Sequence, residues 1–283
     1  MSLRFLSALC AAFALAAAAP AAARLSAAEQ TMIRTVDAEQ ERTVAMLGRW
    51  IDQNSGTLNL AGVEAVGRML RAELEPLGFD VDWIDMKAAG RAGHIVARHK
   101  GNGRGKRMLL IGHLDTVFEP HSPFQRWVRR GAVGEGPGAV DDKGGMAVMV
   151  AAVRAMHRAG TLRPADITVV LTGDEEDVGE PVAIARRDLI ESGRWADVAL
   201  DFEGLARENG RDMATVARRS SNAWTLKVTA RSGHSSGVFA ADAGYGAPAM
   251  AHLVLIALGC GVGKWAARRW RAARAQRAGG GAR

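Results

Sequence analysis

The sequence predicts an α/β fold in which a mixed, mostly parallel sheet lies between helices, with the start of a smaller second domain after it. Short apolar runs alternate with segments of helical periodicity, which is the order that builds a parallel sheet. Clusters of Asp, Glu and His follow directly after several of these runs. The chain has 283 residues, 48% hydrophobic and 24% charged, which is the composition of a folded soluble protein.

The predicted helices and strands alternate along residues 24–212. Apolar residues at helical spacing predict helices at 26–50, 62–74, 144–159 and 182–192. Short apolar runs predict strands at 79–84, 94–97, 107–112, 166–171 and 198–200. In open α/β sheets, ligands bind outside the carboxyl ends of the strands, and the acidic clusters of this chain fall at those ends.

A second domain is predicted to begin at Met213, where longer alternating stretches replace the earlier pattern. A strand is expected at 221–229 and a turn at the sequence GHSSG. We therefore divide the chain into a leader (1–23), a main domain (24–212), the start of a second domain (213–250) and an apolar, then basic tail (251–283).

The leader predicts export. Arg4, an apolar run and small residues at Ala21 and Ala23 form a signal-peptide pattern with cleavage after Ala23, so a periplasmic or secreted protein is expected. The net charge of +7 equals the seven basic residues of the tail, which holds no acid, so the rest of the chain is neutral. Export and this neutrality argue against a nucleic-acid partner.

Two motifs carry candidate metal ligands. The segment IGHLDTV pairs His113 with Asp115, and a carboxylate two residues from a ligating histidine can fix the tautomer of its ring. A structural histidine is an equally good interpretation of this pair alone. In GEGPGAVDDKGG, glycines allow a sharp bend that brings a carboxylate under a metal. Asp141 or Asp142 as a helix N-cap is the alternative.

A third motif, TGDEEDVGE, places four consecutive acids after an apolar strand. Such crowding is costly unless cations or protons neutralise it. One carboxylate can bind metal while its neighbour moves a proton. An exposed acidic loop is the alternative interpretation of this motif by itself.

The order HxD, GPGxxDxKGG, DEE, FEG and GHSSG resembles the di-zinc carboxypeptidase and aminoacylase metallopeptidase family, especially its glutamate carboxypeptidase-like branch. The resemblance runs from about residue 25 to 249. It implies that His113 binds one zinc, Asp141 bridges two zinc ions, Glu176 binds the second and Glu203 completes the first. Asp201 is the alternative to Glu203.

The resemblance also implies catalytic roles. Glu175 would be the general base, Asp115 would orient His113, and His234 in RSGHSSG would reach the active site of the partner subunit. The implied reaction is zinc-dependent hydrolysis of an amide bond in a peptide or N-acyl amino acid with a free carboxylate. The implied second domain is an α+β, ferredoxin-like lid through which the family dimerises.

The C-terminal part departs from the family pattern. The family's last histidine ligand and its substrate-carboxylate arginine have no counterpart before Arg283. We expect a truncated or frame-shifted chain, with weak occupancy of the second zinc site and low activity. A catalytically impaired remnant and a zinc-binding protein tethered to the membrane by residues 244–263 are the alternatives, although this segment is barely long enough to span a bilayer.

Overall fold

The computed structural model describes residues 24–217, 225–229 and 255–256. The chain divides into two compact units, 1–214 and 215–283, and the fold that follows is that of the first unit. The predicted leader, His234 and most of the predicted second domain and tail lie outside the described residues. Within the described residues, no helix is both long and apolar enough to cross a membrane.

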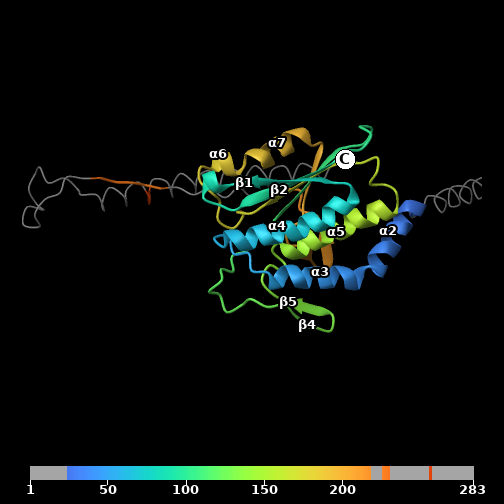
Figure 1. Ribbon diagram of the computed structural model, residues 1–283, viewed down its shortest axis with the longest axis horizontal. Helices are drawn as coiled ribbons and strands as arrows, with labels where there is room; N and C mark the ends of the chain where they lie inside the picture. The colour runs from blue at the N-terminus through green and yellow to red at the C-terminus, as the bar shows by residue number, and fades with distance from the viewer. Residues whose placement is uncertain (1–23, 218–224, 230–254, 257–283) are drawn as a thin grey trace, which may run out of the picture. The chain divides into compact units, whose positions relative to one another are not determined.

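A five-stranded mixed sheet forms the centre of the first unit (Figure 1). Its order is β1-β2-β6-β3-β7, and the strands are β1 (Asp80–Asp85), β2 (Gly93–His99), β6 (Asp166–Thr172), β3 (Arg107–His113) and β7 (Val198–Asp201). Strand β3 is parallel to both β6 and β7, whereas β2 is antiparallel to both β1 and β6. The predicted mixed, mostly parallel sheet between helices is confirmed.

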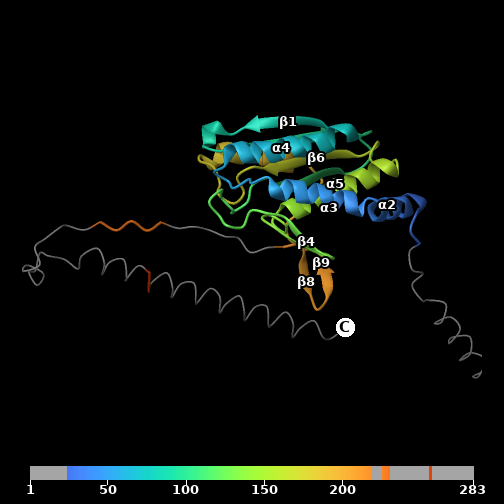
Figure 2. The ribbon, with the colours of Figure 1, turned by 60° about the horizontal axis from the view of Figure 1, so that its bottom comes forward.

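Helices cover both faces of this sheet. On one face lie α4 (Leu60–Leu74) and α5 (Lys143–Arg158), with α2 (Ala27–Ala38) and α3 (Gln40–Asp52) packed against α5 (Figure 2). On the other face lie the short helices α6 (Val182–Ala185) and α7 (Arg187–Trp195) (Figure 1). The larger apolar core lies under α4 and α5, and a smaller one of Val96, Leu109 and Val170 lies under α7.

Helix α4 shows how the sequence produces these elements. The side chain of Asn59 caps it by accepting a hydrogen bond from the Gly62 N–H group. Val63, Val66 and Leu70 recur at helical spacing and are fully buried against the sheet. The helix therefore forms because a capped start coincides with one continuous apolar face.

Three predicted elements were wrong in extent or type. The single helix expected at 26–50 is two helices that meet at Glu39, and both of them pack against α5. The helix expected at 182–192 is divided at Arg186, whose guanidinium turns inward to bind Asp174. Residues 225–229, expected to form part of a strand, form none in the structure, and residues 221–224 of that predicted strand lie outside the described residues.

Two hairpins were not predicted. Strands β4 (Val128–Arg130) and β5 (Val133–Glu135) form one, and β8 (Ala206–Glu208) and β9 (Arg211–Met213) form the other. The second turns through Asn209 and Gly210, which have φ values of 50° and 75°. Asn-Gly between two short extended segments is a strong signal for such a two-residue turn, so this hairpin could have been predicted from the sequence.

Candidate metal centre

The topology of the sheet brings three chemically active segments together. Strands β3, β6 and β7 are parallel, so their carboxyl ends meet at one edge. His113, the last residue of β3, lies opposite Thr172, the last residue of β6. The Phe202 N–H group donates to the carbonyl oxygen of Ile111, at 3.0 Å, which places Glu203 beside the end of β3.

His113 occupies the middle of the cluster. Its side chain is only 1% exposed. The Nδ1 atom lies 3.1 Å from the main-chain oxygen of Asp115 and 3.3 Å from its Oδ1 atom. Its Nε2 atom lies 2.8 Å from Asp141 Oδ1 and 3.9 Å from Glu203 Oε1. With Nδ1 engaged by Asp115, Nε2 is the nitrogen that faces the carboxylates and can bind a metal.

Asp141 and Asp142 have different surroundings although they are neighbours at the start of α5. The Asp141 side chain is 56% exposed and faces His113. Asp142 is fully buried, and its Oδ2 atom accepts a hydrogen bond from the His113 N–H group at 3.1 Å. Asp142 stands at the N-cap position of α5, but its side chain makes no capping hydrogen bond. It instead anchors the Asp141 turn to β3.

Close approach at this anchor requires a residue without a side chain at position 112. A Cβ atom on Gly112 would lie 2.5 Å from Asp142 Oδ2, which is well inside van der Waals contact. The glycine before the histidine therefore allows α5 and the Asp141 turn to lie against the end of β3. The peptide bond between Asp141 and Asp142 is cis.

Asp115 fixes the turn that carries Glu175 and Glu176. Its Oδ1 atom accepts a hydrogen bond from the Glu175 N–H group at 3.0 Å, and its Oδ2 atom accepts one from Glu176 N–H at 3.2 Å. The Thr57 hydroxyl donates to the same Oδ2 atom at 2.7 Å. Asp115 is fully buried. One carboxylate therefore sets the position of the His113 ring and of the acidic turn.

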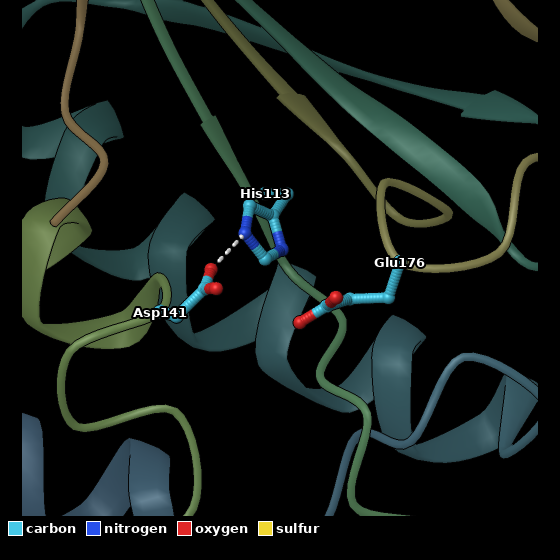
Figure 3. Close-up of side chains that lie close together, drawn as sticks. All are labelled: His113, Asp141 and Glu176. Atoms are coloured by element: carbon cyan, nitrogen blue, oxygen red, sulfur yellow. Dashed lines mark hydrogen bonds and ion pairs between the residues drawn. The ribbon is translucent and has the colours of Figure 1, made fainter. Parts of the chain in front are cut away.

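The approach of the acids to His113 is visible in Figure 3, where the carboxylates of Asp141 and Glu176 point toward the imidazole from opposite sides. Two groups of three residues could each hold a metal ion, because the ligand atoms within each group all lie within 4.8 Å of one another. One group is His113, Asp141 and Glu176, and the other is His113, Glu175 and Glu203. Asp201, the alternative to Glu203, is in neither group.

Ionisation within the cluster reflects its crowded negative charge. Burial and the charge of Asp141 raise the pKa of Glu176 and of Glu203. Burial would lower the pKa of His113, but the hydrogen bond and the charge of Asp115 outweigh it and raise that pKa to about 10. Burial also raises the pKa of Asp142, to about 8.

This donor set fits a divalent metal ion. An imidazole nitrogen and several carboxylate oxygens are the ligands that zinc takes in proteins. Within the described residues, no Lys or Arg side chain pairs with Asp141, Glu175, Glu176 or Glu203. A cation bound between them would relieve the repulsion from Asp141, which adds to burial in raising the pKa of Glu176 and of Glu203.

Sequence reasoning missed the part played by two residues that support the cluster and the burial of a third beside it. Thr57 reaches Asp115 from 58 positions earlier, and no spacing pattern marks it. Asp142 was considered as a helix cap only. Lys143 is fully buried, donates from Nζ to the carbonyl oxygen of Gln53 at 2.8 Å, and has its pKa lowered by burial to about 7. The burial of this lysine is not visible in its own local pattern.

Fold and cluster together define a mixed α/β protein with a carboxylate-rich candidate metal centre at the carboxyl edge of its sheet. Comparison with known families gives the more specific identity. The chain belongs to peptidase family M20/M25/M40, since the sequence profile of that family matches residues 109–252. This confirms the family resemblance read from the motifs. Members of this family generally bind zinc.

Curated relatives include two kinds of hydrolase. The chain is 34% identical over 182 residues to carboxypeptidase G2 of Pseudomonas sp. (strain RS-16), which covers 62% of this chain and 41% of the relative. It is 36% identical over 172 residues to succinyl-diaminopimelate desuccinylase of Novosphingobium aromaticivorans, covering 56% and 44%. The chain thus spans less than half the length of these two relatives.

Solved structures of two dipeptidases share the fold. Dug1p from Saccharomyces cerevisiae aligns with a TM-score of 0.52 and 18% identity, over 61% of this chain and 40% of that one. Human carnosine dipeptidase 1 aligns with a TM-score of 0.53 and 20% identity, over 62% and 41%. At this identity the likeness concerns the fold.

Proposed function

We propose that this chain is a zinc-dependent amide hydrolase of carboxypeptidase type. The observation that carries the proposal is the convergence of His113 Nε2 with the carboxylates of Asp141, Glu175, Glu176 and Glu203, without a basic partner among the described residues. A zinc ion held there would supply a Lewis acid for the scissile carbonyl and would acidify a water molecule. His113, Asp141, Glu176 and Glu203 would be its ligands.

The remaining residues of the cluster would handle protons and orientation. The Glu175 side chain is exposed at the edge of the cluster, so it can take a proton from a water molecule and return it to a leaving amine. Asp115 would hold the His113 ring through Nδ1. In this role it would keep Nε2 directed at the carboxylates.

The substrate class we propose is a peptide or N-acyl amino acid with a free carboxylate. The names of two relatives support it, because one is a carboxypeptidase and the other is a desuccinylase of succinyl-diaminopimelate. Export to the periplasm through residues 1–23 and dimerisation through the second domain, with His234 at the partner's site, are parts of the same proposal.

A catalytically impaired zinc-binding protein is the second candidate, and one observation favours it. Both groups of ligand atoms contain His113, and its Nδ1 atom is engaged by Asp115. Only Nε2 remains, so only one ion can take this histidine. If Asp141 bridged two ions, the second would have two carboxylates from the described residues, whereas zinc normally needs three protein ligands.

The test is hydrolysis by the purified full chain with and without zinc. A panel of N-succinyl, N-acetyl and N-acylglutamate substrates and dipeptides would be followed by mass spectrometry of the released amine. We expect zinc-dependent release that Glu175→Gln abolishes and that Glu180→Gln, an exposed acid of the same loop, leaves unchanged. Zinc binding without release in any substrate would instead support the impaired protein, and release that survives Glu175→Gln would contradict the assigned base.

A further inference from the structure

His94 holds the two ends of the loop that carries Glu175 and Glu176. It lies on β2 with 1% of its surface exposed. Its Nδ1 atom is 3.0 Å from the Gly173 N–H group, and its Nε2 atom is 2.9 Å from the carbonyl oxygen of Ala185. Gly173 directly follows β6 and Ala185 ends α6, so the whole acidic loop lies between these two contacts.

The two partners determine the state of the imidazole. The Gly173 main-chain nitrogen can only donate, so Nδ1 must accept and carries no hydrogen. The Ala185 carbonyl oxygen can only accept, so Nε2 must carry the hydrogen and donate it. Only the neutral tautomer with hydrogen on Nε2 satisfies both contacts, because a doubly protonated ring would present a second donor to Gly173.

The loop between these contacts is held from inside as well. Asp174 is fully buried, accepts a hydrogen bond from the Gly179 N–H group at 2.9 Å, and binds the guanidinium of Arg186. Arg186 also donates to the main-chain oxygen of Asp174 at 3.0 Å. These contacts fold the loop on itself. Among the described residues, His94 is the one side chain of the central sheet that is bonded to both ends of the loop.

We propose that His94 is a positioning residue of the metal centre, which places Glu175 and Glu176 by tying both ends of their loop to β2. The proposal rests on the function proposed above only for the consequence of that placement. The placement itself is a property of the metal-free chain. His94 does not act on the substrate, since its ring is buried and both ring nitrogens are already bonded to the main chain.

Amide hydrogen exchange of the metal-free full chain tests the placement directly. In His94→Leu, the Gly173 N–H group loses its buried acceptor, so local exchange should become roughly tenfold faster or more. We expect this acceleration in the peptide that contains Gly173, Glu175 and Glu176, with no change in β3. Zinc affinity is expected to fall about 10-fold to 100-fold with it.

His99 provides the matched control because it lies on the same strand at the opposite end. Its Nδ1 atom is 2.9 Å from the carbonyl oxygen of Ala165, far along the sheet from the acidic loop. His99→Leu should leave exchange in the acidic loop and zinc affinity unchanged. Equal acceleration in both variants, or in β3 as well as the loop, would mean general destabilisation and would overturn the proposal.

Conservative variants keep the test decisive if His94→Leu fails to fold. In His94→Asn the amide oxygen can take the place of Nδ1 and accept from Gly173, and in His94→Gln the amide nitrogen can take the place of Nε2 and donate to Ala185. Each should restore slow exchange at its own end of the loop. If neither variant slows amide exchange at its own end of the loop, or if both show native exchange throughout the loop, His94 does not position the loop. Exchange results stand even if the native chain proves not to hydrolyse amides.

Discussion

Replacement of Asp115 by asparagine should weaken zinc binding as well as the fold. Asp115 accepts hydrogen bonds from Thr57 Oγ1 at 2.7 Å, Glu175 N at 3.0 Å and Glu176 N at 3.2 Å. In Asp115→Asn one carboxylate oxygen becomes an amide nitrogen, so at least one of these donors meets another donor. A buried donor without an acceptor costs about 1–3 kcal/mol, and the turn that carries Glu176 would shift.

The same substitution removes the negative charge that faces His113 Nδ1, at 3.3 Å. Loss of a partner that orients a ligating histidine typically costs about 10-fold to 100-fold in metal affinity. We therefore expect the zinc dissociation constant of Asp115→Asn to rise by that factor, which equals about 1.4–2.8 kcal/mol. Competition of the metal-free chain with a chromophoric zinc chelator would measure it.

Asp166 offers the matched control for this prediction. It also accepts two main-chain hydrogen bonds, from Gly101 N at 2.9 Å and Gly103 N at 3.0 Å, but it begins β6 at the opposite end of the strand. Asp166→Asn should lose similar stability and keep native zinc affinity. An unchanged dissociation constant in Asp115→Asn, or the same increase in both variants, would refute the role given to Asp115.

Three further predictions concern the core, the close approach at β3 and the proton balance. Leu70→Ala empties a fully buried position under α4 and should lower the free energy of unfolding by about 2–5 kcal/mol in denaturant titration, whereas a loss below about 1 kcal/mol would contradict the packing described. Gly112→Ala would place Cβ 2.5 Å from Asp142 Oδ2, so we expect at least about tenfold weaker zinc binding in the chelator assay, and native affinity would show that the contact is not needed. Because the pKa of His113 is raised from 6.5 to about 10, its protonation stabilises the metal-free fold below about pH 6.5, and this stabilisation is lost as the pH rises toward 10. Zinc must then displace that proton at pH 7, so calorimetry in buffers of different ionisation enthalpy should detect about one proton released per zinc, and no release would contradict the protonated state.

Much of the main domain follows from local pattern in the sequence. The strand that ends at His113 and the helix that follows Asp142 were predictable because short apolar runs and helical periodicity mark them. The division at Glu39 was not, since apolar residues recur at helical spacing on both sides of it. The Asn209-Gly210 hairpin was predictable, because Asn-Gly favours the positive φ values of a two-residue turn.

The candidate ligands were predictable because their motifs stand at the ends of predicted strands. Their support was not, because it comes from side chains distant in sequence. Thr57 reaches Asp115 across 58 positions, and His94 reaches Gly173 across 79. Such contacts depend on how strands pair, and His94 by itself is an unremarkable residue in an apolar strand. The ligand roles, the domain limits and the export of the chain stay predictions.

Zinc content of the native chain and of two ligand variants is the measurement that bears most directly on the metal centre. The purified full chain would be loaded with zinc, dialysed and analysed for metal by elemental analysis, together with His113→Ala and Asp141→Asn. If the cluster at the ends of β3, β6 and β7 is the metal centre, the native chain retains at least one zinc per chain and both variants lose it. A native chain without zinc, or variants that keep it in full, would contradict that assignment.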